Sequence, residues 1–269
     1  MTDKSSPRAL LVGHFSTFGD IEVLEVVKAW LADDEIPFDV SPYTAKVRNA
    51  DPDFVDPAKL DAAAYTHLFV ICGPFTPRLF QSFADLFSRF SHCVWIGVNL
   101  TMSEKIDDFF PFDVLIERDS NRLTRPDLAF RRPNGRVPVV GVCLATRQAE
   151  YGGRRRHDEA RGLLHELVRT QGFATVDLDT CWPPSMNATS FENTTQFLSM
   201  CSKLDVVLST RLHGLVLSLK VGTPVVALDA IAGGDKLSKQ AKAVGWPEVY
   251  LVEDTSLDEL TSAVDRCLQ

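Results

Sequence analysis

Short apolar runs alternate with amphipathic helical segments along most of this 269-residue chain. Residues 9–13, 67–72 and 94–98 are continuous apolar runs that end near turn residues, a pattern typical of buried strands. Segments 21–32 and 79–90 instead carry apolar residues at helical spacing. This alternation predicts parallel sheets with helices on both faces, the α/β class.

A polar, turn-rich stretch at 131–136 separates two such series and is predicted to be a linker. We therefore predict two Rossmann-like α/β domains, 1–130 and 137–269. In the second, the predicted strands are 137–144, 174–178, 204–208 and 225–228, and the predicted helices are 157–170, 194–201, 215–219, 241–244 and 257–268.

Residues 209–224, STRLHGLVLSLKVGTP, carry the clearest functional signal. A buried strand precedes them and a helix follows, so Arg211 and His213 lie where a strand ends and a helix begins. Ligands of open α/β sheets bind at the carboxyl ends of strands. A helix N-terminus at that position attracts anions.

If the chain stays extended through His213, alternate side chains share a face. Arg211 and His213 would then point the same way, with Leu212 turned to the core. A guanidinium can bind a carboxylate or phosphate through two hydrogen bonds, and an imidazole can move a proton near neutral pH. The pair suits an acidic substrate, although a surface salt bridge and a structural helix cap are the alternatives for each residue alone.

This segment resembles the polysaccharide pyruvyl transferase family, which carries S-x-R-x-H-G followed by a helix-to-strand turn A/S-L-x-x-G-x-P. Further elements of the family occur in its order along the chain. They are Gly19-Asp20, Arg118-Asp119-Ser120, residues 126–130, and Lys236 followed by Gly245.

The resemblance implies two Rossmann-like domains facing a cleft, as in GT-B glycosyltransferases, with the acceptor on the 1–130 side and the donor on the 137–269 side. It also implies an enzyme that moves the pyruvyl group of phosphoenolpyruvate onto sugar hydroxyls of a polysaccharide or glycolipid precursor, lipid-linked acceptors included. The product is a cyclic ketal, and phosphate leaves. No step of this reaction requires a metal or another cofactor.

The resemblance and the strand-end positions together assign roles to the second half. His213 is predicted to be the general acid. Arg211 and Arg147 are predicted to hold the carboxylate and phosphate of the donor. Gly214 and Lys236 are further predicted substrate-binding residues, and a plain helix-start lysine is the alternative for Lys236.

In the first half, Asp20 is a predicted catalytic helper at an acceptor hydroxyl, with an N-cap for a helix at Ile21 as the alternative. His14 could reach the same space as a substrate-binding residue, or could be an ordinary loop histidine. Arg118 and Asp119 are predicted to form a structural ion pair. Relatives often carry Gly-Gly where this chain has Cys72-Gly73, so the acceptor pocket is expected to differ.

Composition excludes several other classes of function. The net charge of −8 argues against a nucleic-acid partner. No stretch approaches the ~20 apolar residues of a membrane span, and no signal sequence is evident. The six cysteines show no C-x-x-C spacing, which indicates a reduced, cytoplasmic protein without structural zinc.

Two rival functions remain open. A nucleotide-sugar glycosyltransferase would fit the Gly222-Thr223-Pro224 turn equally well, although residues 215–221 lack the glutamates that often hold a donor ribose. A non-catalytic binding protein on the same fold is the other alternative.

Overall fold

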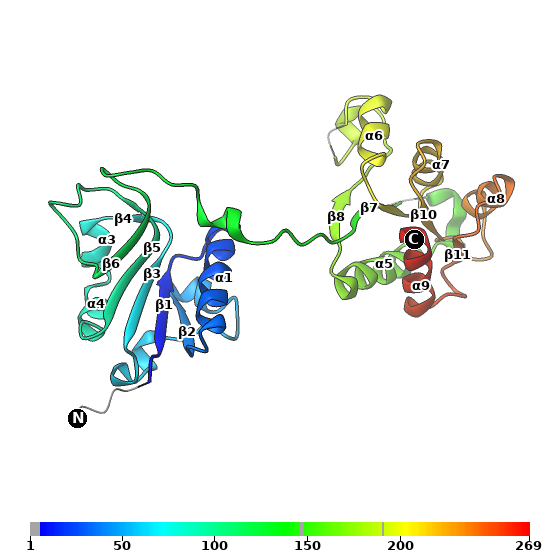
Figure 1. The fold of residues 1–269 in the computed structure, drawn as a ribbon. Helices are drawn as coiled ribbons and strands as arrows, with labels where there is room; N and C mark the ends of the chain where they lie inside the picture. Colours follow the sequence, from blue (N-terminus) through cyan, green and yellow to red (C-terminus); the bar gives the residue numbers. More distant parts are fainter. Residues whose placement is uncertain (1–5, 146–147, 190) are drawn as a thin grey trace. The chain divides into compact units, whose positions relative to one another are not determined.

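The computed structural model describes residues 6–145, 148–189 and 191–269. The chain divides into two α/β units, the first ending at Asn134 and the second starting at Gly135 (Figure 1). This boundary lies inside the polar stretch 131–136.

The first unit is built on a parallel sheet with the order β2-β1-β3-β5-β4, and β6 also pairs with β5. Its strands are β1 (Ala9–Gly13), β2 (Phe38–Pro42), β3 (His67–Ile71), β4 (Pro74–Phe75), β5 (Val94–Met102) and β6 (Val114–Asp119). Its α-helices are α1 (Phe18–Asp33), α2 (Ala45–Arg48), α3 (Pro77–Ser82) and α4 (Ala84–Arg89).

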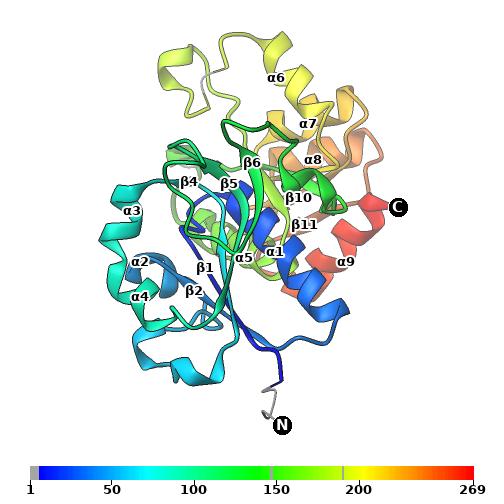
Figure 2. The same ribbon diagram turned by 60° about the vertical axis from the view of Figure 1, so that its left-hand side comes forward.

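Alternate residues of the first sheet supply two separate cores. Helices α1 and α4 lie on opposite faces of this sheet (Figure 2). Leu11 packs with α1 on one face, whereas Leu10 packs with Phe87 of α4 on the other. The predicted helix 79–90 is wrong in one respect, since it is interrupted at Phe83, whose ring stacks on Tyr43 with centroids 4.3 Å apart.

The second unit is a parallel sheet with the order β11-β10-β9-β7-β8. Its strands are β7 (Val139–Cys143), β8 (Ala174–Asp177), β9 (Val206–Ser209), β10 (Val225–Asp229) and β11 (Val249–Leu251). Its α-helices are α5 (His157–Gln171), α6 (Thr194–Cys201), α7 (Leu212–Lys220), α8 (Lys236–Ala243) and α9 (Leu257–Leu268). The chain leaves β7 for β8 on one side and continues with β9 on the other, which creates a switch point between β7 and β9.

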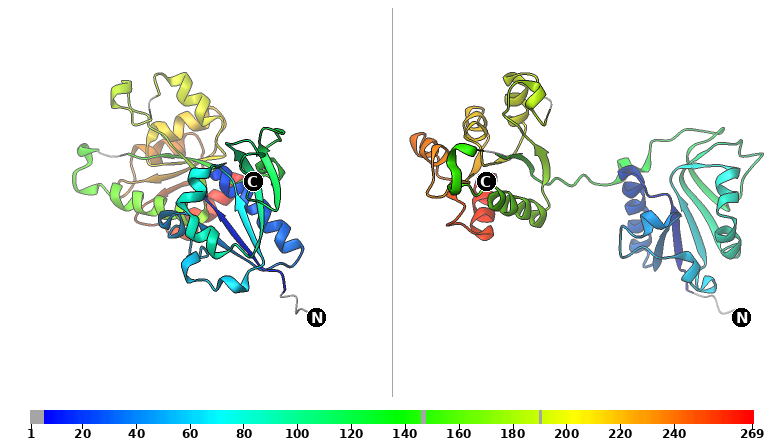
Figure 3. Two further views of the ribbon diagram at one scale, coloured as in Figure 1. Left: turned by 90° about the vertical axis from the view of Figure 1, so that its left-hand side faces the viewer. Right: turned by 180° about the vertical axis from the view of Figure 1, so that it is seen from behind.

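Helices cover both faces of the second sheet (Figure 3). Val206 and Leu208 of β9 pack with α5 and α9, whereas Val207 packs with α6, α7 and α8. Strands buried on both faces explain why this half reads as uninterrupted apolar runs.

The predicted α/β class with two Rossmann-like parallel sheets is confirmed. That the two units face one cleft stays a prediction. Among the described residues, no helix combines the length and the apolar character that crossing a bilayer requires.

Candidate functional site

A pocket of about 260 Å³ lies at the carboxyl ends of three strands of the second sheet. We call it the strand-end pocket. It lies beside the β7–β9 switch point, where open α/β sheets bind ligands. The residues that line it come from the segments after three strands: Ala145 and Gln148 after β7, Thr180 and Cys181 after β8, and Arg211, Leu212 and His213 after β9. Lys236 of α8 completes the lining among the described residues.

Local hydrogen bonds fix the turn from β9 into α7. The Ser209 hydroxyl accepts from the Arg211 N–H at 3.0 Å and donates to the Arg211 carbonyl at 2.9 Å. Thr210 ties the turn to the neighbouring strand, because its hydroxyl accepts from the Ala145 N–H at 2.7 Å. The segment that carries the pocket residues is therefore anchored to both β9 and β7.

The predicted extended chain through His213 is wrong. Arg211 is extended, with φ −107° and ψ 135°, but it is the N-cap of α7, and the helix begins at Leu212. The Arg211 carbonyl accepts the Leu215 N–H at 3.1 Å, which starts the helix earlier than position 215. Leu212 is half-buried and lines the pocket instead of turning to the core.

The N-terminus of α7 opens at this pocket. Within the described residues, no side chain caps the helix. The first N–H groups of a helix lack intrahelical acceptors, and aligned peptide dipoles give that end a partial positive charge. The pocket wall that Leu212 and His213 form therefore favours an anion.

Arg211 is held in one orientation by groups that follow two neighbouring strands, β7 and β8. Its Nε donates to the Leu144 carbonyl at 2.7 Å, and its Nη1 lies 3.4 Å from Asp179 Oδ1 and 3.1 Å from Cys181 Sγ. Only 19% of the side chain is exposed. Its Nη2 has no acceptor among the described residues, so this nitrogen is available to a ligand.

Sequence reasoning missed Asp179 as a partner of Arg211. The signal was present, since Asp179 directly follows the predicted strand 174–178 and the same strand-end rule applies to it. Burial raises the pKa of its carboxyl, but N–H groups of Ala188 and Cys181, each 3.0 Å away, and the charge of Arg211 outweigh that effect. The pKa is lowered overall, so the carboxylate stays ionised beside the guanidinium.

Among the described residues, His213 and Lys236 are the other basic residues that line the strand-end pocket. His213 is the second residue of α7 and is exposed, whereas Lys236 is the first residue of α8. The Lys236 ammonium lies 3.7 Å from Glu150 Oε1 and 5.5 Å from the centre of the Tyr151 ring. Three of the predicted residues, Arg211, His213 and Lys236, thus line one pocket, and Arg147 lies outside the described residues.

Gly214 lets α7 pack closely against the sheet. A Cβ at this buried position would lie 2.2 Å from Ser209 Oγ and 2.9 Å from Cys143 Sγ. Its predicted substrate-binding role stays a prediction beside this packing role. The adjacent Cys143 thiol is unreactive, because burial raises its pKa to about 12.

In the first unit, Asp20 closes a capping box at the start of α1. Its Oδ2 accepts the N–H groups of Ser16 and Thr17, and the Thr17 hydroxyl accepts the Asp20 N–H. The prediction that Asp20 is the N-cap of a helix starting at Ile21 is wrong: α1 starts at Phe18, Thr17 is its N-cap, and Asp20 is the third helical residue. The catalytic role of Asp20 stays a prediction.

His14 follows β1 and packs edge-to-face on Tyr43, with ring centroids 5.1 Å apart. Nearby, Cys72 has φ +62° and Gly73 has φ +84°. Both residues are therefore in the left-handed region that glycine favours, although cysteine stands at the first position. The changed acceptor pocket expected from that departure stays a prediction.

The predicted structural ion pair is present, with Arg118 Nε 2.8 Å from Asp119 Oδ2. Arg118 also contacts Asp127 at 3.1 Å. All six cysteines are free thiols. Over the described ranges, no group of three or more His, Cys, Asp or Glu residues has the arrangement of a metal site.

Comparison with solved structures gives distant likenesses. UDP-GlcNAc 2-epimerase from Methanocaldococcus jannaschii is 10% identical with a TM-score of 0.35, covering 98% of this chain and 93% of that one. E. coli heptosyltransferase WaaC with ADP is 12% identical with a TM-score of 0.31, covering 96% and 99%. These scores are low, so the fold assignment rests on the two parallel sheets themselves.

Comparison with curated protein sequences gives no significant match. The model of the polysaccharide pyruvyl transferase family, in contrast, matches residues 149–230. The matched segment includes Thr180, Cys181, Arg211 and His213 of the strand-end pocket. The resemblance of this chain to the polysaccharide pyruvyl transferase family is thereby confirmed over residues 149–230.

Proposed function

We propose that this protein transfers the pyruvyl group of phosphoenolpyruvate to two hydroxyls of a sugar, forming a cyclic ketal and releasing phosphate. The observation that carries the proposal is the gathering of Arg211, His213 and Lys236 in one pocket at the uncapped N-terminus of α7. The family match over residues 149–230 supports the same chemistry.

Phosphoenolpyruvate carries a carboxylate and a phosphate, and the pocket offers cationic groups for both. The Nη2 of Arg211 and the N–H groups of α7 suit one anionic group, because charge-assisted hydrogen bonds are stronger than neutral ones. The Lys236 ammonium suits the other. Arg147, which follows β7, is proposed as a further cation for the donor.

The proposed reaction begins at the methylene carbon of the donor. The electron pair of its double bond takes a proton from the imidazolium of His213, and the neighbouring carbon becomes cationic. A sugar hydroxyl adds to that carbon and loses its proton to the imidazole. Phosphate then leaves with the electron pair of the C–O bond, and the second hydroxyl closes the ketal as its proton passes to the phosphate.

The first unit is proposed to hold the sugar acceptor, free or lipid-linked. Asp20 Oδ2 is occupied by backbone N–H groups, so the other carboxylate oxygen would contact an acceptor hydroxyl. His14, at the carboxyl end of β1, is proposed to bind the same acceptor. Six free thiols support the proposal that the protein acts in the reducing cytoplasm.

Calorimetry tests the donor directly. We expect phosphoenolpyruvate to bind and UDP-glucose, GDP-mannose and ADP-glucose not to bind. The same titration with Arg211→Ala should show weaker phosphoenolpyruvate binding. Arg154→Ala is the matched control, because it also removes one positive charge but Arg154 pairs with Asp235 and does not line the strand-end pocket. Binding of a nucleotide sugar without binding of phosphoenolpyruvate would overturn the proposal in favour of a glycosyltransferase.

A further inference from the structure

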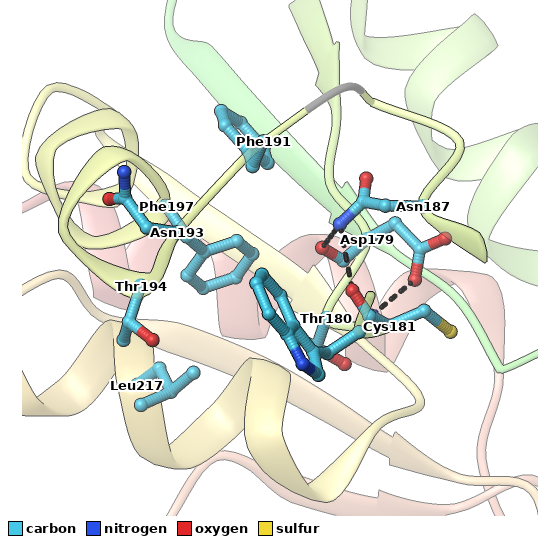
Figure 4. A pocket seen from close by; sticks show the side chains of 10 residues that line it. Asp179, Thr180, Cys181, Asn187, Phe191, Asn193, Thr194, Phe197 and Leu217 are labelled. Carbon is cyan, nitrogen blue, oxygen red and sulfur yellow. Dashed lines mark hydrogen bonds between the residues drawn. The ribbon is translucent and has the colours of Figure 1, made fainter. Parts of the chain in front are cut away.

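A second pocket, of about 110 Å³, is shown in Figure 4. It adjoins the strand-end pocket. We call it the aromatic pocket. Both pockets are lined by Thr180 and Cys181, so a molecule in one lies next to a molecule in the other. The aromatic pocket is also lined by Trp182, Phe191, Asn193 and Thr194.

The aromatic pocket has one exposed and one half-buried aromatic side chain in its wall. Trp182 is 69% exposed, and no residue of the described chain accepts a hydrogen bond from its indole N–H. Phe191 is half-buried and packs edge-to-face on the buried Phe197, with ring centroids 5.6 Å apart. The indole of Trp182 therefore offers an apolar face and an N–H donor to a molecule in the pocket.

Apart from the Asp179 carboxylate, which is paired with Arg211, the polar groups that line the aromatic pocket are neutral, and some of them lack hydrogen-bond partners among the described residues. Asn193 Oδ1 accepts the Gln196 N–H at 3.0 Å, which caps α6, but its amide nitrogen has no acceptor among the described residues. The hydroxyls of Thr180 and Thr194 likewise have no acceptor there. Within the described residues, no lysine or arginine lines this pocket, in contrast to the strand-end pocket.

Hydrogen bonds hold the loop after β8 in shape. The Asp179 carboxylate accepts the N–H groups of Cys181 and Ala188. The Asn187 amide nitrogen donates to the carbonyls of Asp179 at 2.9 Å and Cys181 at 3.1 Å (Figure 4). A loop fixed in this way loses little conformational entropy when a ligand binds.

We propose that the aromatic pocket binds a neutral pyranose ring of the acceptor, so that the second unit contributes to acceptor recognition. A pyranose presents an apolar face of C–H groups, which an indole face attracts through its negative quadrupole, and a rim of hydroxyls for amide and hydroxyl partners. A nucleotide bound here would have to place its phosphates in the neighbouring strand-end pocket, which the proposed function assigns to the donor. The assignment of the sugar as acceptor rests on the proposed function.

Saturation-transfer NMR with methyl pyranosides tests the sugar site. The probes are the methyl glycosides of glucose, galactose, mannose, N-acetylglucosamine and N-acetylmannosamine. We expect at least one to bind, with about tenfold weaker binding in Trp182→Ala. Thr194→Val, which removes one hydroxyl at the start of α6, should also weaken it. Met186→Ala is the matched control, because Met186 is 66% exposed in the same loop but does not line the pocket.

Absence of transfer to every pyranoside, or equal transfer in the parent and Trp182→Ala, would overturn the sugar site. Trp182-dependent binding of UMP or ADP in place of a sugar would overturn it too. Titration of the same samples with phosphoenolpyruvate separates the two proposals. Donor binding without sugar binding defeats this inference alone, whereas Trp182-dependent sugar binding without donor binding defeats the pyruvyl transfer.

Discussion

The carboxylate of Asp179 lies 3.4 Å from the guanidinium of Arg211 and joins the two pockets of the second unit. Asp179 lines the aromatic pocket, and Arg211 lines the strand-end pocket. The same carboxylate accepts two backbone N–H groups of the loop after β8. One half-buried acid therefore contacts both the guanidinium that we propose for the donor and the loop that we propose for the sugar.

Asp179→Ala is expected to destabilise the second unit by about 1–3 kcal/mol, because it leaves N–H groups and a guanidinium without their acceptor. Denaturant unfolding measures this loss. Asp158→Ala is the control, since Asp158 is 96% exposed and should change stability little. Equal stability of the two variants would show that water replaces the Asp179 contacts.

Arg211→Ala is expected to weaken phosphoenolpyruvate binding by about 1.5–3 kcal/mol, or roughly 10- to 150-fold in Kd. Arg211→Lys should recover only part of the affinity, because an ammonium cannot contact the Leu144 carbonyl and the ligand in the same fork geometry. Calorimetry at one ionic strength gives both values. Unchanged affinity in Arg211→Ala would place the donor clamp elsewhere.

His213→Gln is expected to lower turnover by about 10²–10⁴-fold while donor affinity changes little. Glutamine keeps a hydrogen-bond donor but cannot release a proton as imidazolium does, and Arg211 and Lys236 still neutralise the anion. Ketal formation and donor binding should be measured side by side. Turnover near the parent rate would reduce His213 to a contact residue.

Gly214→Ala is expected to destabilise the protein by about 1–3 kcal/mol, because the new methyl would overlap Ser209 and Cys143. Gly162→Ala is the matched control in the exposed interior of α5, where no atom lies within 4 Å of the added Cβ. It should stabilise by about 0.5–1 kcal/mol. Thermal unfolding of both variants tests whether Gly214→Ala lowers the unfolding temperature and Gly162→Ala raises it.

The stability of the second unit is expected to fall as the pH drops below about 6.5, because of His157. Burial first, and then the charge of Arg155, lower the pKa of this imidazole, while the carboxylates of Asp158 and Glu150 oppose them. The unfolded chain then binds the proton more readily than the folded one, so acid favours unfolding.

Urea unfolding at pH 7.5 and 5.5 measures the change, and His157→Gln should reduce it. Glutamine is a fair replacement because His157 Nε2 lies 3.0 Å from the Gln148 side-chain oxygen. An identical pH dependence in parent and variant would assign the effect to other groups.

Local sequence patterns were enough to predict several helices and the position of two pocket residues. The predicted helices at 194–201 and 257–268 coincide with α6 and α9, because each has helical apolar spacing and a side-chain cap within three residues. The pocket positions of Arg211 and His213 followed from a strand-to-helix junction, which also depends only on neighbours along the chain.

Long-range contacts in the tertiary structure determine features that local sequence patterns did not predict, such as where α8 begins and which residue pairs with Arg211. The helix predicted at 241–244 begins at Lys236 instead, because Asp229 at the end of β10 accepts the N–H groups of Asp235 and Ser238. Likewise, Asp179 and Arg211 meet only because β8 and β9 flank β7 in the sheet. Strand order brings distant strand ends to one edge, and no spacing along the chain encodes that order directly.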